Sequence, residues 1–179
     1  MVKKFCFGAF VLDEKNDTII PVYSRFTILA TGGIGQVYKQ TTNPLIATGD
    51  GIAMAIRANA TIKEMEFIQF HPTALYMPKS TSTFLISEAV RGFGAYLKTK
   101  KGRRFLFDYD VRGELASRDI VSRSIETELK NSKNKCVYLD CTHLDILAFK
   151  NHFPTIYQNC LSSGIDVAKD WIPVIPTQH

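Results

Sequence analysis

Residues 26–33 have the sequence FTILATGG, an apolar run that passes directly into two glycines. Aromatic and β-branched residues favour a strand, and glycine lets the backbone turn sharply or approach a ligand closely. The pattern predicts a buried strand followed by a tight turn over residues 30–35. Such a turn suits a phosphate or a flat cofactor, although a tight turn that only needs positive φ is the favoured interpretation. The dinucleotide pattern G-x-G-x-x-G is incomplete, because Tyr38 stands at the position of its third glycine.

Regular elements are expected on both sides of this stretch. Proline marks the breaks, because it donates no backbone hydrogen bond and interrupts strands and helices. The expected elements are, in chain order, a β-hairpin over 5–12 and 18–29, a helix over 52–58, a strand over 66–76 interrupted at His71-Pro72, a helix over 84–91, a hairpin over 96–107, a helix over 117–131, a strand over 137–139, a helical region over 146–161 interrupted at Pro154, and an extended segment from residue 171.

The composition is typical of an ordinary folded domain, or of a small domain with part of another. The chain has 179 residues, of which 45% are hydrophobic and 22% charged, which suffices for a packed core. This excludes a disordered tail, a coiled coil and a collagen-like chain. No apolar run approaches the roughly 18 residues that span a bilayer, so no membrane span is expected. The formal net charge of +5 permits an anionic partner without identifying one.

Four cysteines are spaced irregularly, at Cys6, Cys136, Cys141 and Cys160. With no signal peptide recognisable, this spacing indicates reduced thiols in a cytoplasm-like compartment. Cys136, Cys141 and His143 suggest a zinc site, but C-x4-C-x-H is not a usual ligand spacing. We therefore expect thiols in the core and no metal.

Arg118 falls in the first turn of the longest expected helix, where the helix dipole disfavours a cation by up to about 1 kcal/mol. A residue that breaks a local rule is a candidate functional residue; a surface ion pair with Glu114 or Asp119 is an equally good explanation. Glu88 and Arg91 are three residues apart and can face each other on one side of a helix. That spacing indicates a solvated ion pair or, in a cleft, a pair that passes protons.

The remaining polar candidates are weaker taken singly. His71 lies in an apolar segment and is typical of a core histidine, while His143 and His152 lie in polar stretches typical of the surface. His179 has no context that interprets it. Residues 98–104 hold five basic side chains around one glycine turn. This cluster could bind nucleic acid, but a solvated hairpin tip is the favoured interpretation.

Six stretches, in this order, resemble the middle of the succinate dehydrogenase and fumarate reductase flavoprotein family. They are TILATGG (27–33), TTNP (41–44), GDGIAMA (49–55), QFHPTAL (69–75), SEAVRG (87–92) and RGELASRDIV (112–121). The resemblance covers essentially the whole chain. Residues 71–75 and 112–115 favour the members that oxidise L-aspartate over the respiratory enzymes.

The resemblance implies an α+β fold with FAD as the cofactor. Residues 1–65 would form the C-terminal portion of an FAD-binding α/β domain segment, and residues 66–179 a mixed α+β capping domain that closes over the substrate. The family's N-terminal G-x-G-x-x-G strand–turn–helix is absent, and so is everything that follows His179 in the family. We therefore expect an internal fragment of an enzyme, inactive alone and weak in FAD binding.

The resemblance also implies roles for site residues. Residues that contact FAD or line its cleft are Ala30, Thr31, Gly32, Gly33 and Asp50. Residues that hold the substrate are His71, Ser87, Glu88 and His179. Residues that move protons are Arg118, as the donor, with Glu88 and Arg91 as its relay. Without the resemblance, Asp50 is equally well explained as the N-cap of the helix that follows it.

The activity that the resemblance implies is the oxidation of L-aspartate to iminoaspartate, with oxygen or fumarate as acceptor, in quinolinate and NAD biosynthesis. The substrates would be small dicarboxylates (L-aspartate and fumarate), quinolinate synthase would be a protein partner, and no nucleic acid would bind. Two alternatives remain open. One is a fumarate reductase or succinate dehydrogenase flavoprotein fragment, and the other is a non-catalytic interaction module that uses the basic residues at 98–104.

Overall fold

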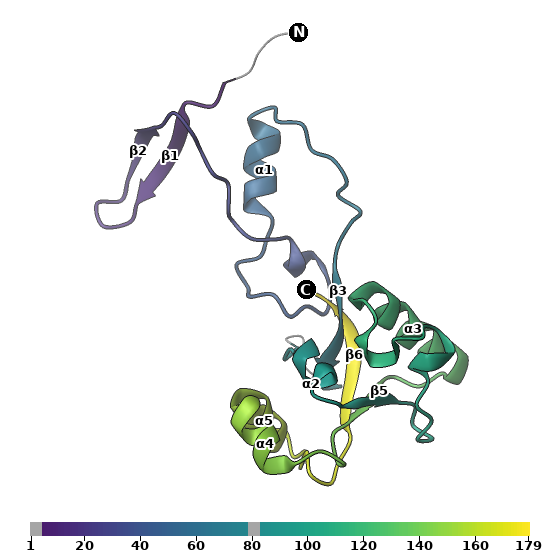
Figure 1. The fold of residues 1–179 in the computed structure, drawn as a ribbon. Coiled ribbons are helices and arrows are strands. Elements are labelled where there is room, and N and C mark those ends of the chain that lie inside the picture. The colour runs from purple at the N-terminus through teal and green to yellow at the C-terminus, as the bar shows by residue number, and fades with distance from the viewer. Residues whose placement is uncertain (1–4, 79–82) are drawn as a thin grey trace.

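A four-stranded antiparallel sheet organises the C-terminal two thirds of the computed structural model, which describes residues 5–78 and 83–179 (Figure 1). The fold is α+β, as expected. The sheet order is β3-β6-β5-β4. The strands are β3 (Phe70–Leu75), β4 (Tyr96–Lys98), β5 (Val137–Asp140) and β6 (Ile172–Gln178), and a separate hairpin holds β1 (Gly8–Asp13) and β2 (Thr18–Tyr23). The helices are α1 (Asp50–Arg57), α2 (Glu88–Gly92), α3 (Arg118–Ser132), α4 (Ile146–His152) and α5 (Pro154–Ser162).

The strand β6 lies inside the sheet, between β3 and β5, although it comes last in the chain. It contains Pro173 and Pro176, which donate no ladder hydrogen bond. Pro173 still contributes its carbonyl oxygen, which accepts the backbone N–H of Tyr76 at 2.8 Å. The extended conformation from residue 171 is confirmed. Because β6 pairs with β3, it brings the end of the chain beside residues 69–71.

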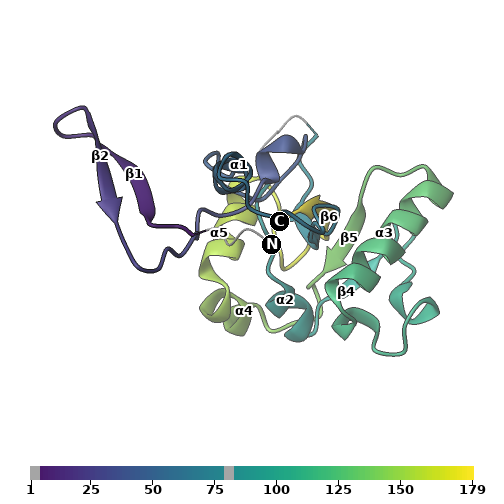
Figure 2. The ribbon, with the colours of Figure 1, turned by 90° about the horizontal axis from the view of Figure 1, so that it is seen from above.

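The hydrophobic core forms where the helices cover this sheet. In Figures 1 and 2, α3 lies on one side of β6 and the α4–α5 pair lies on the other. Among the described residues, the largest fully buried apolar side chains are those of Phe105, Phe149, Ile86, Leu97, Leu106, Ile125, Leu139 and Ile172. Burying each one contributes about 1.5–3 kcal/mol relative to exposure. The core thus holds α2 and α3 rigidly against the ends of β3 and β6.

The expected buried strand over residues 26–33 is wrong. Residues 24–34 form no strand, and the side chains of Phe26 and Ile28 are 89% and 90% exposed. A strand needs hydrogen-bonding neighbours, and the described ranges 5–78 and 83–179 place no strand beside this segment. The hairpin that precedes it is confirmed, with Gly8 opposite Tyr23, although its second strand ends at Tyr23 instead of residue 29.

Two other expected elements are shorter in the structure. Residues 84–86 are extended rather than helical, because Leu85 pairs with Ala74 at the edge of the sheet and the helix begins only at Glu88. The hairpin over 96–107 closes with one bridge, between Lys98 and Arg104, before a short 3-10 turn follows. In contrast, the break at Pro154 is confirmed, because that residue begins a new helix.

Cys136, Cys141 and Cys160 are buried, and Cys6 is exposed; all four are free thiols. Burial raises the pKa of the Cys141 thiol to about 12 and that of Cys160 to about 11. These thiols therefore stay protonated and unreactive. Within residues 5–78 and 83–179 no group of three or more histidine, cysteine or carboxylate side chains could hold a metal ion, and none of the helices there has the length and hydrophobicity of a membrane span.

Candidate active site

A bulge in β3 shapes the first part of the site. The register with β6 shifts between His71 and Ala74, where Pro72 interrupts the ladder. His71 is 1% exposed, and its Nδ1 accepts the backbone N–H of Thr73 at 3.2 Å. An imidazole nitrogen that accepts a hydrogen bond carries no proton, so the proton of a neutral ring resides on Nε2.

The charge state of His71 follows from its surroundings. Burial lowers its pKa to about 4, and the electrostatic influence of Arg118, His179 and Arg91 acts in the same direction, while Glu88 opposes it. The ring is therefore neutral at pH 7 and presents an Nε2–H donor. A neutral donor recognises a carboxylate oxygen by hydrogen bonding rather than by charge pairing.

A second histidine meets the first at the end of β6. The ring centroids of His71 and His179 are 5.5 Å apart, at an interplanar angle of 61°. The Nδ1 of His179 lies 2.7 Å from the hydroxyl oxygen of Thr42, and its backbone N–H donates to the carbonyl oxygen of Gln69 at 3.1 Å. Three stretches that are far apart in the sequence are thus joined at one point.

Arg118 projects from the first turn of α3 and is bound by Glu88 at the start of α2. Its Nε and Nη2 donate to the two carboxylate oxygens of Glu88 at 2.8 and 2.9 Å, and its Nη1 donates to Oε1 of Gln69 at 2.8 Å. The hydrogen bond with Glu88 raises the pKa of Arg118, and that with Arg118 lowers the pKa of Glu88. Both groups are therefore charged at pH 7.

The two surface pairings considered for Arg118 are wrong. The carboxylate of Asp119 instead accepts the hydroxyl of Ser117 at 2.6 Å, and that of Glu114 binds Arg104. The side chain of Arg118 is 31% exposed and does not extend into solvent away from the site. Its five N–H groups serve three hydrogen bonds among the described residues, which leaves two N–H groups for a ligand.

Arg91 lies behind this pair and is almost completely buried. Its Nη2 is 3.8 Å from Oε2 of Glu88, which confirms the expected contact across one helical turn. Its Nη1 donates to the backbone carbonyl oxygen of Glu114 at 2.6 Å, and its Nε has no partner among the described residues. Burial lowers the pKa of Arg91, and the neighbouring charge of Arg118 lowers it further, while Glu88 and Glu114 raise it.

Ser87 caps α2. Its hydroxyl oxygen accepts the backbone N–H of Ala89 at 3.2 Å, which satisfies one of the free donors at the helix start. That bond orients the first turn, from which Glu88 reaches Arg118. The hydroxyl hydrogen of Ser87 is not used in this bond, so it is free to donate to a ligand.

The glycine turn at residues 30–33 is open. Gly32 has φ of 78°, and no atom lies within 4 Å of the position a Cβ would occupy there. Gly51, in the first turn of α1, faces Thr31 so closely that a Cβ would overlap the threonine hydroxyl. Gly49 is the N-cap of α1, with φ of 82°, so the expectation that Asp50 caps this helix is wrong. Asp50 accepts the hydroxyl of Thr48 at 2.8 Å and is exposed.

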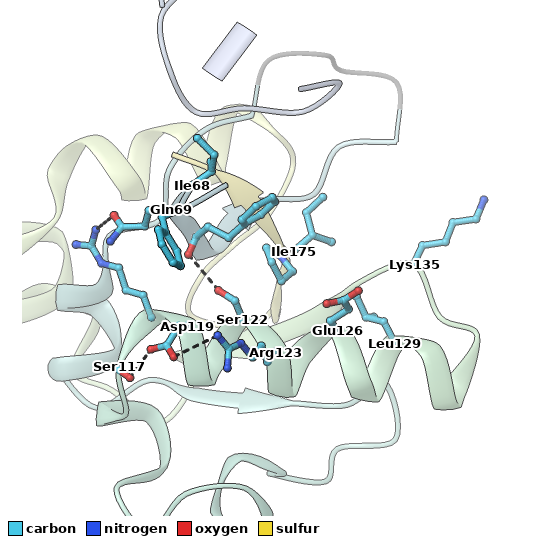
Figure 3. A pocket seen from close by; sticks show the side chains of 14 residues that line it. Ile68, Gln69, Ser117, Asp119, Ser122, Arg123, Glu126, Leu129, Lys135 and Ile175 are labelled. Atoms are coloured by element: carbon cyan, nitrogen blue, oxygen red, sulfur yellow. Dashed lines mark hydrogen bonds and ion pairs between the residues drawn. The ribbon is translucent and has the colours of Figure 1, made fainter. Parts of the chain in front are cut away.

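Two hollows meet near Gln69. The larger one, about 990 Å³, runs along α3 from Ser117 to Leu129 (Figure 3). It extends away from the two histidines, toward Leu129 and Lys135. The smaller one, about 380 Å³, lies between the glycine turn at Gly33 and Ile34 and the end of the chain at His179. The smaller hollow therefore connects the candidate cofactor residues with the candidate substrate residues.

These residues fit one part of a flavin cofactor. Gly32 has open space where a Cβ would stand, Gly51 in the first turn of α1 lies against Thr31, and the smaller hollow runs from Gly33 to His179. Glycine-lined backbone at a helix start suits a flat, anionic group. The sequence lacks the complete glycine pattern that would hold the nucleotide half.

Two residues of the site were not predicted individually. Gln69 binds Arg118 through its side chain and His179 through its carbonyl oxygen, and Thr42 binds the imidazole of His179. Both lie within stretches that carry the family resemblance. Neither has a residue type or spacing that marks it in a single sequence.

The amino-acid sequence is similar to a known protein family and to individual curated proteins. A family model described as "FAD binding domain" matches residues 3–179. L-aspartate oxidase 1 of Ralstonia nicotianae is 52% identical over 174 residues, which is 97% of this chain and 32% of that protein. L-aspartate oxidase of Pseudomonas aeruginosa is 49% identical over 176 residues, or 98% of this chain and 32% of that protein. The chain thus spans about a third of the length of these curated relatives.

Solved structures agree in fold. A structure titled "Quinol-Fumarate Reductase with Menaquinol Molecules" superposes with a TM-score of 0.79 at 34% sequence identity, covering 90% of this chain and 31% of that one.

Proposed function

The chain belongs to the family of FAD-binding domains found in the succinate dehydrogenase and fumarate reductase flavoproteins, and from this membership we propose that it is part of an L-aspartate oxidase. The reaction converts L-aspartate to iminoaspartate, with oxygen or fumarate as the final acceptor, as a step toward quinolinate and NAD. Bound FAD supplies the acceptor for the hydride that leaves the α-carbon of the substrate. The observation that carries the proposal is the Arg118–Glu88 pair beside the two facing histidines.

Substrate binding follows from the donors in the site. A dicarboxylate needs hydrogen-bond donors or cations at both ends if its reacting carbon is to be held in one orientation. The neutral His71 offers an Nε2–H, His179 offers a second imidazole 5.5 Å away, and Arg118 retains two unused N–H groups. We assign the hydroxyl of Ser87 and the carboxylate of Glu88 to the carboxylate and amino ends of the substrate. Closure over the ligand strengthens each contact by excluding water.

Proton transfer is assigned to Arg118, with Glu88 and Arg91 as its relay. A guanidinium has a pKa above about 12 and is a poor acid in water, and its hydrogen bond with Glu88 raises that pKa further. It can donate only toward a carbon on which negative charge develops, as in the reduction of fumarate. Glu88 contacts both arginines, at 2.8 Å and 3.8 Å, so it is placed to return a proton to Arg118.

Cofactor binding is assigned to the glycine turn and the start of α1. Ala30, Thr31, Gly32 and Gly33 would border the flavin, and Asp50 would accept a hydrogen bond from it. The exposure of these residues and the open face at Gly32 support this assignment. We propose the division at residue 65 on the same grounds, with the FAD-binding portion before it and the capping domain after it.

The deciding experiment compares substrates. The enzyme that carries these residues is assayed with L-aspartate and with succinate, at equal flavin content. Oxidation of L-aspartate is expected; oxidation of succinate alone would favour the fumarate reductase or succinate dehydrogenase alternative. An absorbance spectrum of the purified 179-residue chain tests whether it binds FAD by itself, because stoichiometric flavin bands would contradict the weak binding that we expect.

The non-catalytic alternative receives less support from the structure. Lys98, Arg103 and Arg104 each pair with a carboxylate, those of Asp140, Glu128 and Glu114 respectively. These pairs neutralise most of the basic hairpin. A salt-dependent interaction with nucleic acid, lost when Lys100 and Lys101 are neutralised, would support this alternative.

A cytoplasmic location and an association with quinolinate synthase are two further proposals, which follow from a role in quinolinate and NAD biosynthesis. Pull-down with the purified synthase tests the association.

A further inference from the structure

Glu114 is a buried carboxylate that no assigned role explains. It is 4% exposed and lies in the 3-10 turn Gly113–Leu115, directly before α3. Its Oε1 accepts the backbone N–H of Leu97 at 3.1 Å and Nε of Arg104 at 2.9 Å, and its Oε2 accepts Nη2 of Arg104 at 2.6 Å. A buried charge with three hydrogen bonds is satisfied and strongly held.

Arg104, the side-chain partner of Glu114, also packs against two aromatic rings. The guanidinium of Arg104 lies 3.9 Å from the ring centroid of Tyr96 and 4.6 Å from that of Phe107. Gly113, with φ of 55°, packs against the same Phe107 ring, and a Cβ there would overlap it. The turn that carries Glu114 therefore has little freedom to shift.

The backbone of this turn reaches the proton relay. The carbonyl oxygen of Glu114 accepts Nη1 of Arg91 at 2.6 Å, and within residues 5–78 and 83–179 this is the one hydrogen bond of that guanidinium. Its other polar neighbour, Glu88, is at the longer distance of 3.8 Å. The position of the carbonyl oxygen thus decides how far Arg91 stays from Glu88.

We propose that Glu114 is a positioning residue for the relay: its carboxylate, clamped by Arg104, fixes the turn whose carbonyl oxygen holds Arg91 within reach of Glu88. The proposal rests on the proposed function, because it assumes that Arg91 and Glu88 return protons to Arg118. Without this hold, Arg91 loses its hydrogen bond to the carbonyl oxygen of Glu114 and is no longer kept beside Glu88.

The test compares two buried carboxylates in the flavin-loaded enzyme. Glu114→Gln keeps the side-chain shape but places an amide N–H₂ group against Nη2 of Arg104. Glu128→Gln is the matched control, because Glu128 is also buried at 9% exposure and accepts two hydrogen bonds from Arg103, at 2.8 and 2.7 Å, without a contact to Arg91. Arg104→Lys is a milder second variant, which loosens the same clamp if Glu114→Gln folds poorly.

Two readouts are required. Turnover in fumarate reduction, which needs proton delivery, should fall about tenfold or more in Glu114→Gln, while KM changes less than about twofold. In protein with 15N-labelled arginine, the side-chain N–H groups of Arg91 should exchange faster with solvent. Arg104→Lys should move both readouts in the same direction by a smaller amount, and Glu128→Gln should move neither.

The outcomes separate this proposal from the proposed function. If Glu114→Gln matches Glu128→Gln in turnover and leaves the exchange of Arg91 unchanged, the positioning role is overturned. If the unmodified enzyme turns over neither L-aspartate nor fumarate, the proposed function fails. In that case, faster exchange of the Arg91 N–H groups in Glu114→Gln, but not in Glu128→Gln, would still show that Glu114 positions the guanidinium of Arg91.

Discussion

The guanidinium of Arg118 and the carboxylate of Glu88 share two hydrogen bonds, of 2.8 and 2.9 Å, between the starts of α3 and α2. Both helix starts are fixed by the core beneath them, so the two charged groups meet without long, mobile connections. The pair is nevertheless half open, with Glu88 49% exposed and Arg118 31% exposed. Its contribution to stability is therefore small, which makes it a favourable place for mutational tests of function.

Replacing Glu88 by glutamine should reduce activity and hardly affect folding. The amide offers Arg118 one acceptor oxygen in place of two, and it cannot return a proton. Turnover in the flavin-loaded enzyme should fall by about 10²-fold or more, with the midpoint of thermal unfolding almost unchanged. Glu126→Gln is the control, because Glu126 forms an exposed ion pair with Lys130 on the same helix as Arg118. Equal turnover in both variants would exclude a catalytic role for Glu88.

The neutral state of His71 predicts a dependence of stability on pH. Its folded pKa of about 4 lies below the ordinary value of 6.5, so the unfolded chain binds the proton more tightly. The free energy of unfolding is therefore unaffected by this group above about pH 6.5. It decreases as the pH falls toward 4, by up to about 3 kcal/mol. Urea unfolding between pH 4.5 and 7.5 measures this loss. In His71→Gln the slope over that range should be reduced, and an unchanged slope would contradict the low pKa.

Adding a methyl group at Gly51 should disturb the contact between α1 and the glycine turn. A Cβ at Gly51 overlaps the hydroxyl of Thr31, and we expect Gly51→Ala to cost about 1–3 kcal/mol of unfolding free energy. Gly92→Ala is the control, because a Cβ there meets no atom within 4 Å and alanine favours a helix. Adding Thr31→Ala to Gly51→Ala should recover part of the loss. Equal stability of the two glycine variants would show that the contact does not matter.

The cap of α2 can be tested against the start of α3. Ser87→Ala removes a side-chain hydrogen bond to the N–H of Ala89 and should cost about 1 kcal/mol. Ser117 occupies the same position before α3, but its side chain makes no capping bond there and donates to Asp119 instead. Ser117→Ala should therefore cost less. Denaturant unfolding of both variants measures the difference, and the reverse order would refute the capping assignment.

The family membership, the α+β class and FAD as the cofactor were all predictable from the order of six short stretches. Local rules also predicted the first hairpin, α1, the long helix α3 and the break at Pro154, because each depends on residues that are neighbours in the sequence. The strand expected over residues 26–33 failed for a different reason. Its composition favours a strand, but a strand forms only where another strand pairs with it, and composition carries no information about that partner.

Tertiary structure decided which side chains of the site contact one another. Thr42 and His179, which share a hydrogen bond, are 137 residues apart, and Glu88 and Arg118 are 30 apart. The sequence equally allowed Arg118 to pair with Glu114 or Asp119. The sheet order settled these pairings, because inserting β6 beside β3 brings His179 to His71, and the packing of α2 and α3 on the same core brings Glu88 to Arg118. Residue types and local spacing thus determined which chemistry was available, whereas long-range packing determined which groups meet.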